Sequence, residues 1–244
     1  LEQFRVRRLT VPLKRLPPAL DGLTIAQVSD LHVGRFTRGG LLREIVAATN
    51  ALDADLVLLT GDLINYDLAD LPAGLDLVKA MRARHGVFMC EGNHDLFESP
   101  LAFHLQTRDA GVPLLVNQSA AFEIRGVPVQ LLGLAWSRDD ANLASDLRKL
   151  LAQRTADAFP ILLAHHPHAF DHAEDLPLTL SGHTHGGQLM LTDHTGFGPA
   201  MFRYWSGLYR KEERALVVSN GVGNWFPLRV RAPAEIIHLT LRRA

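Results

Sequence analysis

The chain contains a single cysteine, Cys90, so it cannot form an internal disulfide, and cysteine usage leaves its compartment open. The formal net charge of -1 and the lack of a basic stripe give no support for a nucleic-acid partner. No apolar run is long enough to span a bilayer, and no secretory signal, repeat or low-complexity tract is visible. What remains is a chain of 244 residues, 47% of them hydrophobic, that can form one large core and does not demand two domains.

Residues 1–22 form a basic lead-in, and we expect residues 23–244 to fold as a single domain. The five basic residues of the lead-in are interleaved with apolar ones and are Arg5, Arg7, Arg8, Lys14 and Arg15. They fit either an edge strand with one charged face or a segment that meets an anionic membrane surface. Because the chain begins at Leu1 rather than Met, we also expect that an N-terminal anchor or signal has been cut away. These features favour a membrane-associated or envelope location, with a cytoplasmic one as the alternative.

Short apolar runs alternate with helical patterns after residue 22. The pattern predicts strands over 24–29, 56–59 and 87–90, with helices over 41–51 and 74–84 between them. This order is typical of a parallel sheet with right-handed crossovers. Further helices are expected to start at Ser99-Pro100 and to span 143–154; further strands are expected over 112–117, 121–125, 127–134, 161–164, 178–180, 216–219 and 236–241. The β-rich second half therefore suggests a second sheet packed on the first.

Five of the apolar strands end in side chains that carry oxygen or nitrogen donors. In chain order these are Asp30 and His32, Asp62, Asn93 and His94, His165, and His183 and His185. Ligands bind outside the carboxyl ends of strands in open α/β sheets, so these donors should converge on one rim. Nitrogen and oxygen donors suit Mn, Fe, Zn, Co or Ni almost equally. Because Cys90 lies within a strand, no thiolate joins the set.

The corner Gly92-Asn93-His94-Asp95 follows the predicted strand at 87–90. Gly92 allows a sharp turn there, and the next two residues offer an amide oxygen and an imidazole on one rigid corner. Alone this is a weak signal, because Asn and His are ordinary turn residues. Its weight comes from the other strand ends that carry the same chemistry.

Taken in order, Asp-x-His, Gly-Asp, Gly-Asn-His-Asp, a histidine after an apolar strand and Gly-His-Thr-His resemble the calcineurin-like metallophosphoesterases. The resemblance runs from about residue 24 to the C-terminus. The segments at 186–188, 219–223 and 233–236 are similar to the membrane-associated bacterial branch that YkuE and YaeI typify. The family's fold is an α/β class, four-layer α/β/β/α sandwich of two mixed sheets, which we therefore expect here.

The resemblance also implies two divalent metal ions, with Mn, Fe or Zn expected first. One ion would be held by Asp30, His32, Asp62 and His185; the other would be held by Asp62, Asn93, His165 and His183. Asp62 would bridge both, together with a hydroxide that attacks phosphorus. His94 would not be a ligand but would protonate the leaving oxygen or stabilise the phosphoryl charge, with Asp95 fixing its tautomer. His165 is preferred over His166 because the family ligand comes first after the apolar run.

The expected reaction is hydrolysis of a phosphoester or pyrophosphate in a small-molecule or lipid-linked substrate, most simply by a phosphodiesterase. The alternative is a lipid-nucleotide pyrophosphohydrolase of the UDP-2,3-diacylglucosamine type. Exposed apolar residues would favour it, and the candidates, for which core positions are the alternative, are Phe36, Leu96, Phe97, Phe103, Met201, Phe202, Tyr204 and Trp205. Arg35, Arg38 and His194 are candidate substrate contacts, with solvated side chains as the alternative. A scaffold that kept the fold and lost catalysis is disfavoured because every expected ligand is present.

Overall fold

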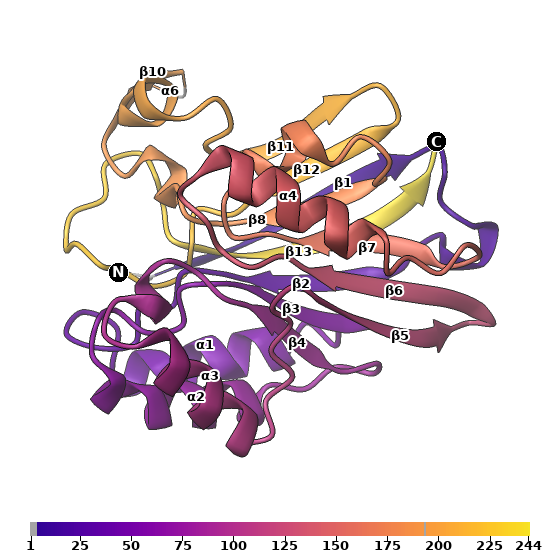
Figure 1. The fold of residues 1–244 in the computed structure, drawn as a ribbon. Coiled ribbons are helices and arrows are strands. Elements are labelled where there is room, and N and C mark those ends of the chain that lie inside the picture. Colours follow the sequence, from indigo (N-terminus) through magenta and orange to yellow (C-terminus); the bar gives the residue numbers. More distant parts are fainter. Residues whose placement is uncertain (1–3, 193) are drawn as a thin grey trace.

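Two large mixed sheets form the centre of the structure, a computed structural model that describes residues 4–192 and 194–244 (Figure 1). The first sheet has the order β1-β13-β2-β3-β4. Its strands are β1 (Arg5–Leu13), β13 (Glu235–Arg243), β2 (Thr24–Val28), β3 (Leu56–Thr60) and β4 (Val87–Cys90). The strands β2, β3 and β4 run parallel, as the alternation of strands and helices predicts, whereas β13 is antiparallel to β2. The carboxyl ends of β2, β3 and β4 therefore lie at the same edge.

The second sheet has the order β11-β12-β8-β7-β6-β5. Its strands are β11 (Gly207–Lys211), β12 (Arg214–Val218), β8 (Leu178–Ser181), β7 (Phe159–Leu163), β6 (Val127–Gly133) and β5 (Gln118–Ile124). The four central strands are parallel, and an antiparallel strand flanks them on each side. A short ribbon of β9 (Met190–Thr192) and β10 (Thr195–Gly196) lies apart from both sheets.

Helices cover the outer faces of the two sheets (Figure 1). The first sheet is covered by α1 (Gly40–Asn50), α2 (Leu71–Ala80) and α3 (Pro100–Asp109). The second is covered by α4 (Asp140–Leu151) and the short α5 (Ala169–His172), while α6 (Phe197–Met201) belongs to a loop region. Four 3₁₀ turns complete the described elements: η1 (Pro18–Leu20), η2 (Leu68–Asp70), η3 (His94–Leu96) and η4 (His185–Gly187). Among the described residues, no helix is both long enough and apolar enough to span a membrane.

Side chains that alternate along each strand join the layers. In β3, Leu58 packs between the two sheets with Ile161 of β7, whereas Leu59 packs under the helices with Phe103. In β7, Leu162 faces the other way and packs with α4. Successive strand residues point to opposite faces, so strands buried on both sides read as continuous apolar runs. The expected sandwich of two mixed sheets between helical layers is confirmed.

The expected strand over 112–117 is wrong, because only a single bridge between Met89 and Leu114 joins this segment to β4. Pro113 has no N–H to donate, which limits it as a strand residue. The expected helix over 74–84 begins and ends earlier, as α2 (Leu71–Ala80), because Met81 is already extended. Sequence patterns did not indicate β9, β10, β11 or α6.

The basic lead-in forms the edge strand β1, which pairs in parallel with β13. Its arginines meet a buried carboxylate, since Arg5 Nη2 lies 2.8 Å from Glu235 Oε2 and Arg7 Nη1 lies 3.4 Å from Glu235 Oε1. Arg8 Nη1 lies 2.7 Å from Nδ1 of His238, which is on β13 with Glu235. Part of the positive charge of this segment is thus paired with Glu235 inside the protein.

Candidate metal centre

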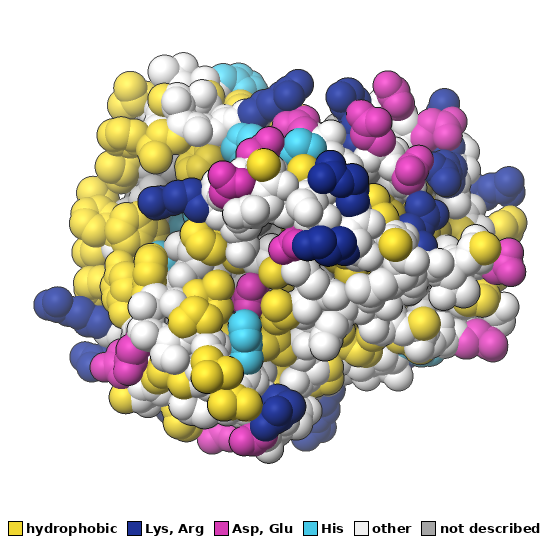
Figure 2. Space-filling view, in the orientation of Figure 1, with side chains coloured by type: hydrophobic (Ala, Val, Ile, Leu, Met, Phe, Trp, Pro, Cys, Tyr) yellow, Lys and Arg dark blue, Asp and Glu magenta, His cyan; other side chains and the backbone are white. Residues whose placement is uncertain are grey.

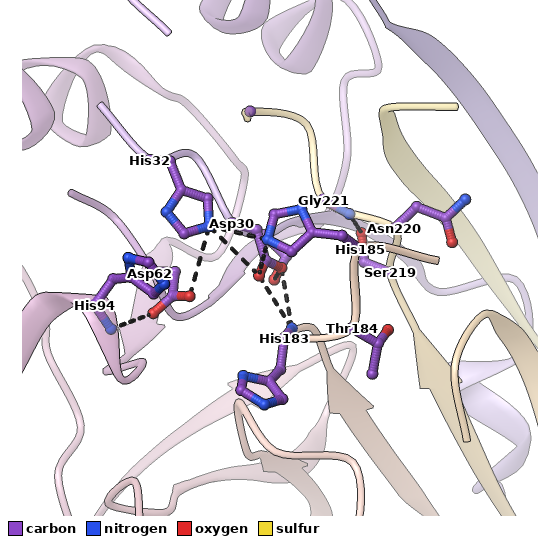
Figure 3. Close-up of polar contacts among 12 residues, drawn as sticks. Asp30, His32, Asp62, His94, His183, Thr184, His185, Ser219, Asn220 and Gly221 are labelled. Atoms are coloured by element: carbon purple, nitrogen blue, oxygen red, sulfur yellow. Dashed lines mark hydrogen bonds and ion pairs between the residues drawn. The ribbon is translucent and has the colours of Figure 1, made fainter. Parts of the chain in front are cut away.

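The ends of β2, β3, β4, β7 and β8 bring the predicted donors to one rim between the sheets. Figure 3 labels Asp30, His32, Asp62, His94, His183 and His185 among them. Five of these residues have backbone φ angles in the left-handed region, and they are Asp30 (51°), His32 (45°), Asp62 (55°), His183 (74°) and His185 (49°). Such conformations cost about 1–2 kcal/mol each for residues with a Cβ and cluster at functional sites. Gly92 allows a close approach, because a Cβ there would collide with Asp62 Oδ1 and with the backbone nitrogen of Asp62. The chain thus turns sharply after each strand and aims its polar side chains inward.

A first donor set consists of Asp30, His32 and His185, whose ligand atoms all lie within 4.8 Å of one another. His32 Nε2 is 3.0 Å from His185 Nε2, and His185 Nε2 is 3.3 Å from Asp30 Oδ1. Asp62 faces the same set, with Oδ2 3.6 Å from His32 Nε2. All four side chains are almost completely buried.

A second donor set consists of Asp62, His165 and His183, joined by the amide of Asn93. His165 Nε2 lies 3.2 Å from Asp62 Oδ2 and 3.2 Å from Asn93 Oδ1. His183 Nδ1 lies 2.9 Å from Asn93 Oδ1 and 3.2 Å from His165 Nε2. Imidazole nitrogens therefore face carboxylate and amide oxygens at short distances in both sets, a donor chemistry that fits metal binding.

Burial and nearby charge set the protonation of the four histidines. Burial lowers the pKa of His32 to about 3 and lowers the pKa of His183 and of His185 well below the usual value, so all three are neutral as metal ligands must be. Burial also disfavours a charged His165, but the carboxylate of Asp62 outweighs it and raises the pKa of His165 to about 9. Burial raises the pKa of Asp30 to about 6. Positive charge is thus favoured beside Asp62, and a divalent ion would supply it.

A model of the family described as calcineurin-like phosphoesterase matches residues 23–187, more than half of the chain. The chain belongs to this family. "Transmembrane protein with metallophosphoesterase domain" from Danio rerio is 31% identical over 98% of this chain and 58% of that protein. Bacillus subtilis YkuE, an uncharacterized metallophosphoesterase, is 31% identical over 96% of this chain and 84% of its own. Escherichia coli phosphodiesterase YaeI is 30% identical over 88% of this chain and 80% of its own.

Among solved structures, the Plasmodium protein titled "GAP50 the anchor in the inner membrane complex" has a similar fold, with a TM-score of 0.50 at 15% identity. The match covers 89% of this chain and 80% of that one. The chain spans 58–63% of the length of the first curated relatives it matches. Family and relatives support a metal-dependent phosphoester hydrolase, and the resemblance in the sequence motifs is confirmed.

Backbone and side-chain contacts hold the donors of this phosphoesterase domain in place. Asp30 accepts hydrogen bonds from Ser29 Oγ at 2.5 Å and from the backbone N–H of His183 at 3.0 Å. His165 Nδ1 donates to Thr60 O at 2.7 Å, which leaves Nε2 free to bind a cation. The ring and its tautomer are thereby fixed.

Arg229 is a supporting residue that sequence reasoning missed. Its Nη2 lies 2.9 Å from His185 Nδ1, and its guanidinium donates to Asn220 O at 2.7 Å, Gly223 O at 2.6 Å and Asn224 Oδ1 at 2.6 Å. Burial lowers the pKa of Arg229 to about 10, so it stays charged. No motif marks this arginine, because its partners lie in an irregular loop and in a residue 44 positions away.

Replacing Arg229 with alanine should lower the free energy of unfolding by about 2–4 kcal/mol, because several carbonyl oxygens lose a charged donor together. Urea unfolding of the metal-free protein measures this. Arg231→Ala is the matched control, since Arg231 is exposed and lies two residues on. Equal loss in both variants would show that the contacts of Arg229 do not hold the loop.

The histidine of the Gly-Asn-His-Asp corner lies beside the first donor set. His94 Nδ1 is 2.6 Å from Asn65 O, its backbone N–H donates to Asp62 Oδ1 at 2.8 Å, and its ring is 4.5 Å from that of His32. The expected orienting role of Asp95 is wrong, since Asn65 occupies that position. Asp95 instead accepts the backbone N–H groups of Asp62 (3.0 Å), Gly92 (2.8 Å) and Ile64 (3.1 Å). The carboxylate of Asp95 points away from the ring of His94 because both residues lie in the 3₁₀ turn η3, where successive side chains point in different directions.

One ligand atom from each of His32, Asp62 and His94 also lies within 4.8 Å of the other two. The geometry alone thus admits His94 as a ligand, and its catalytic role stays a proposal. The ring of His166, by contrast, lies tilted against those of His168 and His183, at 4.6 and 5.0 Å, and His166 is in neither donor set.

The candidate substrate contacts lie further out. Arg35 and Arg38 are exposed, in a loop whose Thr37 Oγ1 accepts the backbone N–H of Asn224. His194 lines a separate cavity with Arg5, Arg7 and Arg231 rather than the pocket beside His183 and His185. The candidates for exposed apolar residues divide as follows: Phe103 and Tyr204 are buried, Phe36, Phe97 and Met201 are exposed, and Leu96, Phe202 and Trp205 are intermediate.

Proposed function

We propose that this domain is a binuclear, metal-dependent phosphodiesterase. The observation that carries the proposal is the position of Asp62, whose Oδ2 lies 3.6 Å from His32 Nε2 and 3.2 Å from His165 Nε2. One carboxylate therefore faces both donor sets. A carboxylate can offer an oxygen to each of two cations, and its charge offsets the repulsion between them. The name of YaeI supports diesters as the substrate class.

The donors divide between two divalent ions in the way the family resemblance implies. Asp30, His32, Asp62 and His185 would hold one ion; Asp62, Asn93, His165 and His183 would hold the other. Imidazole and carboxylate ligands suit Mn, Fe and Zn. When bound, such ions stabilise the charge of the phosphoryl group and supply a nucleophile at neutral pH.

His94 would handle the proton that the leaving oxygen needs. Because Asn65 O can only accept, Nδ1 of His94 donates to it. The Nε2 atom then carries a proton only in the imidazolium form, which can give that proton to a leaving alkoxide. The carbonyl of Asn65 also holds the ring in position for the transfer.

The proposed place of action is a membrane or envelope surface. Relatives that are named transmembrane proteins support this location. The pairing of Arg5 and Arg7 with Glu235 leaves less of the lead-in's charge for anionic lipid than the sequence suggests. The proposed substrate is a small phosphoester, without a nucleic-acid partner.

The protein should hydrolyse bis(p-nitrophenyl) phosphate when loaded with Mn²⁺, and should lose that activity on dialysis against a chelator and regain it with metal. Elemental analysis of the loaded protein should give two ions per chain. A catalytically silent scaffold would instead hold no stoichiometric pair of ions. Activity that survives complete removal of metal would contradict the proposal.

A further inference from the structure

An apolar pocket of about 310 Å³ lies beside the metal centre. His183 and His185 form part of its wall, and the rest is mainly Leu189, Phe197, Met201, Phe202, Trp225 and Phe226. We call it the tail pocket. Figure 2 shows hydrophobic side chains gathered along the left margin of the molecule, over α6 and the neighbouring C-terminal loop of Figure 1. The volume is at the lower end of the range for small-molecule sites, roughly 300–1,000 Å³.

Aromatic rings connect the tail pocket to the metal centre. The ring of Phe202 lies 5.8 Å from that of His183, edge to face. The ring of Trp225 lies 6.4 Å from that of His185 and 6.3 Å from that of His94. A group seated in the pocket would therefore lie next to residues from both donor sets and next to the proposed proton donor.

The two loops that form the pocket are fastened to each other. Gln188 Nε2 donates to Leu228 O at 2.7 Å and to Phe226 O at 3.3 Å, and Gln188 O accepts from the backbone N–H of Val230 at 2.9 Å. Met190 N–H donates to Val230 O at 2.9 Å. Hydrogen bonds between the two loops thus hold the walls of the pocket together.

The side chains around the opening stay exposed despite their apolar character, with Met201 at 66%, Phe197 at 54% and Phe226 at 42%. Exposed apolar surface of this kind marks binding sites when it is contiguous. Because the pocket wall includes two metal-donor residues, its occupant must be something that also reaches the metal centre. A phosphoester with an apolar substituent meets both conditions.

We propose that the tail pocket binds an alkyl or acyl group of the substrate while the phosphate occupies the metal centre. This inference rests on the proposed phosphoesterase function and narrows its substrate class to phosphodiesters with an apolar arm. Moving such an arm from water into the pocket is favourable in proportion to the apolar area that is buried. The same site would discriminate weakly among small polar diesters, which leave the pocket unfilled.

The test compares hexyl p-nitrophenyl phosphate with methyl p-nitrophenyl phosphate, both monomeric in solution, on the Mn²⁺-loaded protein. The two esters share a leaving group, so they differ only in the arm. We expect kcat/KM to be about tenfold or more higher for the hexyl ester, because additional methylenes leave water. Met201→Gln and Phe226→Ser should reduce this ratio to within about threefold of unity.

Leu191→Gln is the matched control, because Leu191 is 73% exposed near α6 but does not line the tail pocket. It should keep the native ratio. A native ratio near one overturns the inference while the phosphoesterase function stands, and so does a preference that all three variants retain. If neither ester is hydrolysed, the proposed function fails. Calorimetry then tests, independently of catalysis, whether the tail pocket binds an alkyl group. In that experiment the native protein should bind hexylphosphonate more tightly than methylphosphonate, and equal affinities would overturn the inference.

Discussion

Replacing Asp62 with asparagine should reduce kcat/KM for phosphodiesters by about a thousandfold or more, the largest loss we expect from any single ligand change. The carboxylate faces both donor sets, so its loss affects both cations at once. Burial opposes its ionisation, but the charge of His165 and its hydrogen bond outweigh burial and hold the pKa of Asp62 well below its usual range. An asparagine amide has one oxygen and no charge to replace it. Steady-state kinetics and elemental analysis should show lost activity together with fewer than two bound ions.

Asp67→Asn is the matched control, because Asp67 is an exposed carboxylate that caps η2. It should keep both ions and native turnover. Retention of two ions and most of the activity by Asp62→Asn would refute the binuclear assignment.

The metal-free protein offers an independent readout of the Asp62–His165 pair. The carboxylate of Asp62 holds the pKa of His165 at about 9, so the asparagine variant should lower that pKa in an NMR titration. Since the folded pKa exceeds the unfolded value of about 6.5, the pair stabilises the metal-free fold fully below about pH 6.5 and less as pH rises through about 9. The variant should lack this loss of stability at high pH. An unchanged pKa of His165 would show that the two side chains do not interact in solution.

The sequence predicts that the donor side chains cluster, because strand ends carry a simple physical signal. Leu56 to Leu59 are apolar without alternation, which indicates a strand buried on both faces. Asp62, which follows this run after Thr60 and Gly61, is therefore expected beyond the carboxyl end of the strand. The same reasoning places His165 after β7 and His183 after β8. What this reasoning does not provide is the left-handed backbone at Asp62 and His183, which depends on how the chain turns in three dimensions.

Contacts between loops account for what the sequence does not predict. Arg229 meets His185 only after an irregular segment without periodicity has folded back over the donors. In the sequence, Trp225 and Phe226 show no pattern that indicates a shared site. They line one pocket with α6 because Gln188 hydrogen-bonds to their loop. Asp95 shows the opposite error, since adjacency in sequence suggested a contact with His94 that a 3₁₀ turn prevents. Local patterns therefore locate the donors, and long-range packing decides what surrounds them.

Replacing His94 with alanine should lower kcat for a dialkyl phosphate by about two to four orders of magnitude while both metal ions stay bound. The first effect follows from losing a proton donor whose Nδ1 is fixed by Asn65 O at 2.6 Å. The second follows because each proposed ion keeps all of its ligands. Kinetics and elemental analysis of the same sample measure the two effects together. His183→Ala is the contrasting variant and should lose one ion, since His183 Nδ1 belongs to the second donor set.

Leaving groups of different basicity separate the two roles that His94 can have. A proton donor matters little for p-nitrophenolate, which leaves readily, and much for a basic alkoxide such as that of an alkyl ester. The loss caused by His94→Ala should therefore be larger for a dialkyl phosphate than for methyl p-nitrophenyl phosphate. An equal loss for both would assign His94 to stabilising the phosphoryl charge instead. A variant that binds only one ion would place His94 among the metal ligands, next to His32 and Asp62, as the distances between their donor atoms allow.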